Sequence, residues 1–119
     1  VPLRDFYSYE AKYLDENGAL LKIPADLTEA QIRTVQDLAV RTFQSLCCEG
    51  MARVDCFLTE DGRWQVNEVN TIPGFTRISM YPKLWQASGL TYGDLIDRLI
   101  QLAIERFERE KRLKTTFDF

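Results

Sequence analysis

The sequence contains no histidine, only three cysteines and no long apolar run. Without histidine, serine and cysteine triads, His-ligated zinc and a histidine general base are excluded. Cys47, Cys48 and Cys56 form neither an even disulfide framework nor a CxxC pair, so we expect reduced thiols, with Cys47 and Cys48 as small core residues near a helix end. Any catalysis must therefore use carboxylates, cations, backbone amides or a hard metal ion.

The charge balance is slightly acidic, with 15 Lys and Arg against 18 Asp and Glu and a net charge of −3. Such a chain offers no basic field for nucleic acid or for an anionic membrane surface. No apolar run approaches the roughly 20 residues that a membrane-spanning helix needs, and no secretory signal is visible. We therefore expect a cytoplasmic protein with neither nucleic acid nor membrane as a partner.

The 119 residues, 45% of them hydrophobic, suit one globular domain with a modest core. The chain begins at Val1 inside a Pro- and aromatic-containing segment, which predicts a piece of a longer protein. Residues 1–19 lack a helical or strand period and are expected to form a long functional loop. Residues 20–24, LLKIP, are expected to form a short strand ended by Pro24.

Apolar residues at helical spacing predict two long helices. Thr28 and Gln31 fit a capping box at the start of a helix over about 29–47, with Gly50 close enough to end it. Thr91, followed by Asp94, fits the N-cap of a last helix that reaches about residue 112. Between these helices, residues 71–90 are predicted to be loop-like with one short helix over about 82–87.

Two extended runs, MARVDCFL and RWQVNEVN, flank an Asp-Gly pair, the strongest short signal for a β-hairpin. A two-residue turn at Asp61-Gly62 places Glu60 opposite Arg63, Phe57 opposite Val66, Asp55 opposite Glu68 and Arg53 opposite Asn70. A four-residue loop keeps this register, whereas a three-residue loop breaks it. One face of the hairpin then presents Arg53, Asp55, Glu68 and Asn70 together, and Val54, Cys56, Leu58 and Val69 form the core face.

Two interpretations of this polar face remain open. Opposed like charges destabilise a sheet, so Asp55 against Glu68 calls for a compensating cation. In the first interpretation, Arg53 neutralises both acids in a surface salt-bridge cluster. In the second, Asp55, Glu68 and Asn70 supply hard oxygen ligands for Mg²⁺ or Mn²⁺, and Arg53 stabilises charge on a transferring group.

Beyond periodicity, the amino-acid sequences of three segments resemble those of a known family: FYSYEAKY (Phe6 to Tyr13), ARVDCFL (Ala52 to Leu58) and NEVNTIPGFTRISMYPKLWQASGL (Asn67 to Leu90). Their order and spacing are similar to the C-terminal part of the D-alanine-D-alanine ligases, ATP-grasp enzymes of peptidoglycan synthesis. The resemblance implies ATP-dependent ligation of two D-alanines through an acyl-phosphate, and a homodimer for the full-length enzyme.

The resemblance also implies roles for individual residues. Asp55, Glu68 and Asn70 match ligands of two Mg²⁺ ions, with Glu68 bridging them. Arg53 and Gly74 match groups that stabilise the reacting centre, Gly74 through its backbone amide. Ser79 and Met80 match the site of the second D-alanine, although the family commonly has an aliphatic residue at position 80. Lys12 matches a phosphate-contacting lysine of a mobile loop, and Tyr13 matches the tyrosine of enzymes that make the dipeptide.

The expected fold is therefore α+β: the C-terminal part of an ATP-grasp domain, with an antiparallel hairpin packed on helices near 29–47 and 91–112. Residues 1–19 would be the active-site loop, 51–70 the metal-binding hairpin and 71–90 the substrate-binding loop. The family's N-terminal domain is missing from this sequence, so these residues alone are expected to be inactive. The competing hypotheses are an ATP-grasp ligase that uses D-lactate or D-serine, and a non-catalytic binding module.

Overall fold

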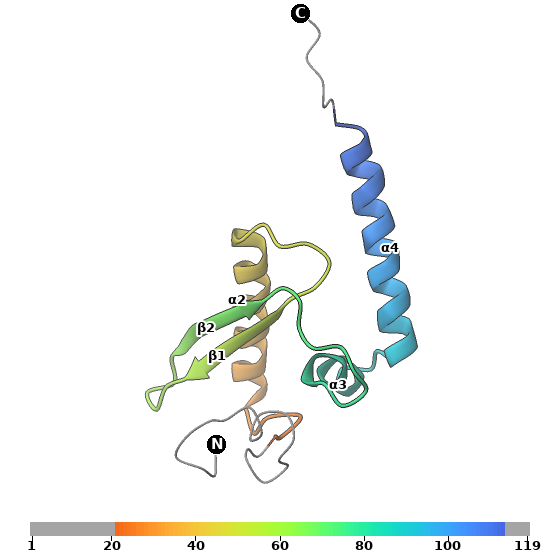
Figure 1. The fold of residues 1–119 in the computed structure, drawn as a ribbon. Coiled ribbons are helices and arrows are strands. Elements are labelled where there is room, and N and C mark those ends of the chain that lie inside the picture. Colours follow the sequence, from red (N-terminus) through yellow and green to blue (C-terminus); the bar gives the residue numbers. More distant parts are fainter. Residues whose placement is uncertain (1–20, 114–119) are drawn as a thin grey trace, which may run out of the picture.

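The computed structural model describes residues 21–113 and confirms the α+β class (Figure 1). Its elements in chain order are α2 (Glu29–Ser45), β1 (Arg53–Leu58), β2 (Trp64–Asn70), α3 (Met80–Ala87) and α4 (Tyr92–Lys111). Within this part of the chain, β1 and β2 form one two-stranded antiparallel sheet. The predicted loop over 1–19, with Lys12 and Tyr13, lies outside the described residues.

Helix α2 begins with the predicted capping box, but its C-terminal cap differs from the predicted termination at Gly50. The Thr28 hydroxyl accepts from the Gln31 amide, and the Gln31 side chain accepts from the Thr28 amide, which completes the capping box. The helix ends when Cys47 takes φ 54°, and the Cys48 and Cys47 amides bond back to Phe43 and Gln44. This Schellman arrangement stops the helix before Gly50 is reached. It also turns Cys47 outward, so the prediction of Cys47 as a core residue is wrong.

The hairpin loop is one residue longer than the predicted two-residue turn. The Gly62 amide donates to the Thr59 carbonyl at 2.9 Å, and the Thr59 amide donates to the Arg63 carbonyl at 2.9 Å. Residues 60–62 thus form a three-residue loop, in which Gly62 at φ 82° adopts the left-handed conformation that this turn requires. Glu60 is therefore not paired with Arg63, and the register next to the loop shifts by one residue.

A β-bulge restores the predicted register at the open end of the hairpin. Asn67 is the extra residue, because Cys56 pairs with Val66 while the preceding Asp55 pairs with Glu68. Arg53 opposite Asn70 and Asp55 opposite Glu68 are confirmed. Phe57 opposite Val66 is wrong: Phe57 pairs with Gln65, and the one-residue shift moves Val66 and Trp64 to the face that carries Cys56 and Leu58.

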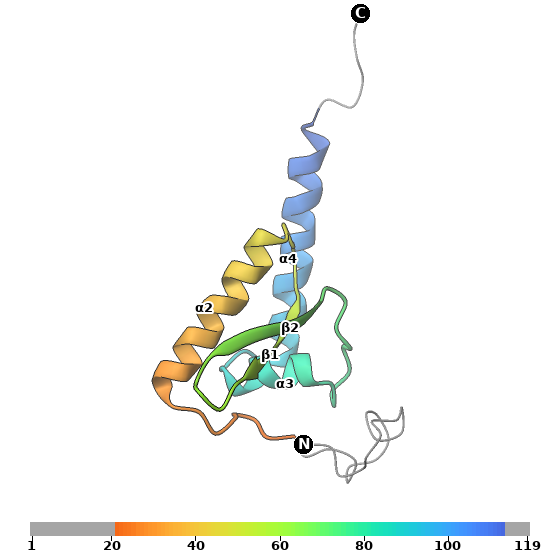
Figure 2. The same ribbon diagram turned by 90° about the vertical axis from the view of Figure 1, so that its left-hand side faces the viewer.

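Helices α3 and α4 follow one another beyond the open end of the strands and run in crossing directions (Figures 1 and 2). Gly89 at φ 95° ends α3, with the Leu90 amide bonded to the Trp85 carbonyl. The Thr91 hydroxyl accepts from the Asp94 amide and caps α4 as predicted. The predicted short helix is confirmed, starting two residues earlier, at Met80.

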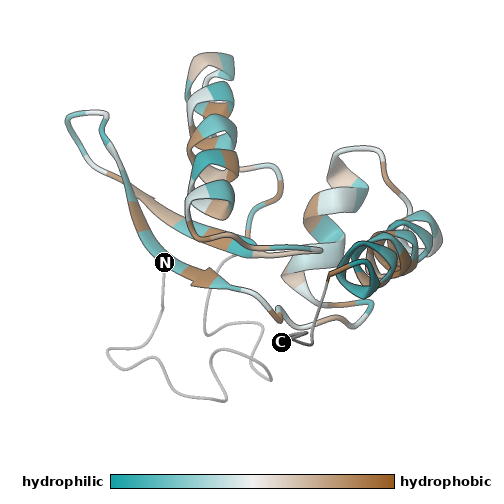
Figure 3. Ribbon diagram, turned by 90° about the horizontal axis from the view of Figure 1, so that it is seen from above, coloured by the Kyte–Doolittle hydropathy of each residue, from teal (hydrophilic) through white to brown (hydrophobic). Residues whose placement is uncertain are grey.

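The packing of the long helices on the hairpin differs between them. Helix α2 contacts β1, whereas α4 packs chiefly on α3. The carboxylate of Glu49, in the segment after α2, ties α4 in place through ion pairs with Arg106 (3.1 Å) and Arg109. Helix α4 carries both hydrophobic and hydrophilic residues (Figure 3). Large apolar side chains stay exposed along it, among them Ile100, Ile104 and Phe107.

The strand predicted over 20–24 is absent from the described part of that range, residues 21–24. The segment bends at Ile23 and Pro24, and Lys22 pairs with Asp26 across the bend. Proline has no amide hydrogen to donate, and β1 and β2 pair with each other rather than with this segment.

Candidate functional site

The open end of the hairpin brings four of the predicted site residues together. The Arg53 guanidinium donates to both carboxylate oxygens of Asp55, from Nε at 2.8 Å and from Nη2 at 3.0 Å. Its Nη2 also lies 3.8 Å from Oε1 of Glu68. The side chains of Arg53, Asp55 and Glu68 are 19%, 32% and 56% exposed, so the guanidinium is the most covered and Glu68 reaches furthest into solvent.

This geometry explains how two opposed carboxylates are tolerated in one strand pair. Planar guanidinium binds a carboxylate through two parallel hydrogen bonds, which hold it in a fixed orientation. With Arg53 held on Asp55, its charge also lies between Asp55 and Glu68 and offsets their repulsion. The cation that the sequence called for is therefore Arg53 in this structure, as the salt-bridge interpretation predicts.

The donor set also suits a hard cation. Asp55, Glu68 and Asn70 contribute carboxylate and amide oxygens to one face, which Mg²⁺ and Mn²⁺ prefer. Asn70 Oδ1 accepts from the Ile72 amide at 3.0 Å, and a carbonyl oxygen keeps a second lone pair for a ligand. No cluster of three His, Cys, Asp or Glu suited to a metal occurs in residues 21–113, and the candidate donor set consists of two carboxylates and the Asn70 amide oxygen.

Helix α3 positions the other predicted site residues at the end of the loop over 71–79. Ser79 is the N-cap of α3 by backbone conformation, yet its hydroxyl makes no cap bond. The hydroxyl instead accepts from the Thr76 amide at 2.9 Å and lies 2.7 Å from Thr76 Oγ1. A Cβ added at Gly74 would lie 3.3 Å from Ser79 Oγ, so the glycine leaves room for this hydroxyl. Met80, the first residue of α3, is half-buried.

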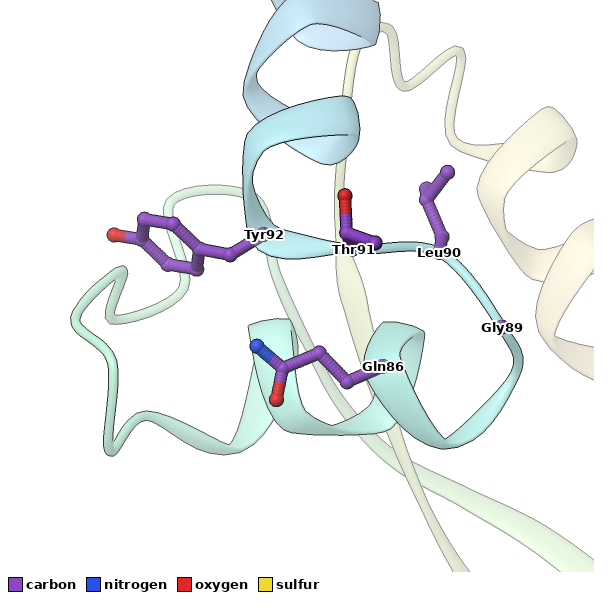
Figure 4. A pocket seen from close by; sticks show the side chains of 5 residues that line it. All are labelled: Gln86, Gly89, Leu90, Thr91 and Tyr92. Carbon is purple, nitrogen blue, oxygen red and sulfur yellow. The ribbon is translucent and has the colours of Figure 1, made fainter.

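An aromatic cluster anchors this loop on α3 and α4. The Phe75 ring lies 5.4 Å from the Tyr92 ring and 6.0 Å from that of Tyr81, between centroids. The Tyr92 side chain points from the start of α4 toward the loop (Figure 4), and its hydroxyl donates to the Phe75 carbonyl at 3.4 Å. Burial raises the pKa of Tyr81, which keeps its phenol neutral.

Sequence reasoning missed the supporting residues Phe75, Thr76 and Tyr92. Thr76 and Ser79 stand three residues apart in a turn, a spacing at which side chains of this kind bond to the backbone. This signal was present in FTRIS. The contact between Phe75 and Tyr92 spans 17 residues and has no local signature.

The surface hollow between α3 and α4 does not coincide with these residues. Gln86, Gly89, Leu90, Thr91 and Tyr92 line it (Figure 4), and only Tyr92 among them belongs to the aromatic cluster described above. The polar hairpin face and the loop over 71–79 are open surfaces of the described residues, so geometry and donor chemistry, rather than a cavity, mark the candidate site.

A sheet face with carboxylate and amide oxygens and a held arginine, followed by a loop with backbone amides and a hydroxyl, has the chemistry that would suit an anionic substrate and its cation. Comparison with known proteins then specifies the family. The model of the "D-ala D-ala ligase C-terminus" matches residues 1–101. The chain therefore belongs to the D-alanine-D-alanine ligase C-terminal family, as the resemblance predicts.

Individual relatives agree with this family assignment. The chain is 62% identical over 116 residues to the D-alanine-D-alanine ligase of Shouchella clausii, covering 98% of this chain and 32% of that protein. The solved D-alanine-D-alanine ligase from Coxiella burnetii superposes with TM-score 0.77 and 48% identity, over 79% of this chain and 27% of that one. The Bacillus anthracis ligase, solved with ATP, gives TM-score 0.64 and 31% identity over 72% and 30%. The chain thus spans about a third of the length of the curated relatives it matches. No helix among residues 21–113 is long and apolar enough to cross a membrane.

Proposed function

We propose that these residues act as the C-terminal part of the ATP-grasp domain of a D-alanine-D-alanine ligase, in a chain of the length of its relatives. The observation that carries the proposal is that the family match includes both the Arg53-Asp55-Glu68-Asn70 face and the loop from Gly74 to Ser79. The apolar side chains exposed along α4 support it, because further chain in a full-length ligase would have a surface to pack on.

In the proposed reaction, a carboxylate oxygen of the first D-alanine attacks the γ-phosphorus of ATP, and the bond from that phosphorus to ADP breaks. The amine of the second D-alanine then attacks the acyl-phosphate carbonyl, the bond to phosphate breaks, and the amine loses its proton. The products are D-alanyl-D-alanine, ADP and phosphate. Because ATP is the co-substrate and the product serves cell-wall peptidoglycan, we place the reaction in the cytoplasm, and we propose a homodimer for the full-length enzyme.

Asp55, Glu68 and Asn70 are the residues that would hold the two Mg²⁺ ions, or Mn²⁺. Bound there, the ions would neutralise triphosphate charge. Arg53, oriented by Asp55, supplies a fixed cation to the reacting carboxyl group. The Gly74 amide faces the developing oxyanion, and Ser79 with the Met80 backbone receives the carboxylate of the second D-alanine. Lys12 contacts phosphate, and Tyr13 favours an amine as the acceptor.

The decisive experiment replaces the acids of the hairpin with their amides in the full-length ligase that carries these residues. Asp55→Asn and Glu68→Gln should abolish dipeptide formation and weaken Mn²⁺ binding measured by water-proton relaxation. Glu60→Gln is the matched control, since Glu60 is exposed in the hairpin loop. Wild-type turnover in Asp55→Asn or Glu68→Gln would refute the metal-binding role, and failure of the unmutated ligase to join two D-alanines would refute the proposed activity.

A further inference from the structure

Thr76 and Ser79 are joined by three short contacts inside one turn. The Ser79 amide donates to the Thr76 carbonyl at 3.0 Å, and the Thr76 amide donates to Ser79 Oγ at 2.9 Å. The third contact, between the two hydroxyl oxygens, is 2.7 Å long, and either hydroxyl is able to donate in it. The position of the Ser79 oxygen is therefore fixed by Thr76 from two directions, once by its backbone and once by its side chain.

Hydrogen-bond accounting shows what this arrangement does to the Ser79 hydroxyl. A serine hydroxyl has one hydrogen to donate and two lone pairs that accept. The Thr76 amide occupies the first lone pair. When Thr76 Oγ1 donates in the third contact, it occupies the second, and the Ser79 hydrogen is left as the free bonding element. In that state the Ser79 hydroxyl is purely a donor, the complement of a carboxylate, which only accepts.

The surroundings hold this turn in place on both sides. On one side, Gly74 lies so close that its missing side chain is what leaves space for Ser79 Oγ. On the other, Phe75, the neighbour of Thr76, is fixed by ring contacts with Tyr81 and Tyr92 and by the bond from the Tyr92 hydroxyl. Thr76 therefore sits on a braced segment, and its hydroxyl does not need to be ordered when a ligand arrives.

We propose that Thr76 is a positioning residue that makes the Ser79 hydroxyl an obligate donor and so sets the preference of the site for an acceptor that carries a carboxylate. This inference rests on the proposed function, in which Ser79 contacts the carboxylate of the second substrate. Thr76 touches neither substrate in this proposal and acts through Ser79 alone.

The experiment is a competition between two acceptors in one tube, in the full-length ligase that carries these residues. D-alanine is the donor and one acceptor; D-alaninamide, whose carboxylate is replaced by a carboxamide, is the other. The ratio of D-alanyl-D-alanine to D-alanyl-D-alaninamide, measured by mass spectrometry, reports the preference for a carboxylate. Because both products form on the same enzyme molecules, the amount of folded protein cancels from the ratio.

The proposal predicts that Thr76→Val, which removes the hydroxyl and keeps the shape and the amide, lowers this ratio by roughly 5- to 10-fold, the effect of one hydrogen bond between neutral groups. Thr76→Ser should restore it, and Ser79→Ala should lower it at least as far. For D-alanine alone, Thr76→Val should raise the acceptor KM and leave kcat nearly unchanged. The matched control is Thr34→Val on α2, which removes a hydroxyl bonded to the Ala30 carbonyl and should leave the ratio unchanged.

Two results would overturn the inference, and they differ in what else they affect. If Ser79→Ala lowers the ratio and Thr76→Val does not, Thr76 is no positioning residue, and the proposed function is untouched. If Ser79→Ala also leaves the ratio unchanged while dipeptide still forms, Ser79 does not contact the carboxylate, and the inference fails with that role. A ligase that forms no dipeptide at all would refute the proposed function itself.

Discussion

Replacing Arg53 with methionine removes the guanidinium that lies between Asp55 and Glu68 while keeping an unbranched side chain of similar length. The substitution breaks two hydrogen bonds, at 2.8 and 3.0 Å, and leaves the two carboxylates opposed on the strand pair. Exposed ion pairs contribute about 0.2–1 kcal/mol, and opposed like charges on a sheet cost up to about 1 kcal/mol. Since Arg53 is only 19% exposed, we expect the variant to lose about 1–2 kcal/mol in the free energy of unfolding.

Magnesium separates the two interpretations of this face. If Asp55, Glu68 and Asn70 bind the ion, Mg²⁺ takes over the neutralisation in Arg53→Met, and a concentration 100 times the dissociation constant stabilises the folded state by about 2.7 kcal/mol. If the face is only a salt-bridge cluster, MgCl₂ acts as NaCl does at the same ionic strength, through screening.

The assay is urea unfolding followed by tryptophan fluorescence, from Trp64, which pairs with Leu58 in the hairpin, and from Trp85 of α3, in MgCl₂ and in NaCl of matched ionic strength. The control is Arg63→Met: Arg63 pairs with Asp61 in the exposed loop of the same hairpin, at 2.7 Å, and should show a small loss and no magnesium response. Equal unfolding midpoints of Arg53→Met in the two salts would refute the metal-binding interpretation.

Three further predictions concern a thiol, an ion-pair cluster and the acceptor preference of the full-length ligase. Burial, and then the charge of Asp55, raises the pKa of the Cys56 thiol above its usual range, so its alkylation should be slow at neutral pH and rise as the pH is raised, while exposed Cys47 reacts first; equal labelling by peptide mass mapping would contradict this. Glu49→Gln breaks the ion pairs with Arg106 and Arg109, so it should lower the free energy of unfolding by about 0.5–1 kcal/mol and speed amide hydrogen exchange in the second half of α4. Unchanged exchange would show that apolar packing alone holds the helix. Tyr13→Phe in the full-length ligase should shift acceptor use from D-alanine toward D-lactate, and an unchanged preference would remove Tyr13 from the acceptor site.

Local signals predicted the helices well because the determinants lie within one or two turns. The Thr28 capping box and the Thr91 cap are contacts over three residues, and both form as expected. The end of α2 was predicted less well. Glycine is favoured in the left-handed conformation, yet Cys47 adopts it here, three residues before Gly50.

In the hairpin, the pairing of Asp55 with Glu68 was predicted correctly from a loop length that is wrong. Asp61-Gly62 suggested a two-residue turn, but the loop has three residues, and this alone would have moved Glu68 to the wrong face. Asn67, the extra residue of the bulge, shifts the register back, so that Asp55 still faces Glu68. No pattern in the sequence marked the bulge, because its reason lies in the pairing of the whole hairpin. The error remains visible near the loop, where Phe57 faces Gln65.

The residues on the two sides of Asn70 divide the chemistry of the candidate site between them. Before Asn70, the strand pair presents oxygens that accept, with Asp55 and Glu68 held beside one fixed cation. After it, the loop carries the two groups that act as donors in the proposed function, the Gly74 amide and the hydroxyl of Ser79. Asn70 joins the two halves: it lies opposite Arg53 on the polar face of the hairpin, and its side-chain oxygen accepts from the Ile72 amide at the start of the loop. A reaction that needs a cation near a triphosphate and donors near an oxyanion requires both halves at a fixed separation. In the full-length ligase, Asn70→Asp should therefore lower the rate of dipeptide formation more than its nearly unchanged shape suggests. The substitution adds a negative charge at the side chain that joins the two halves.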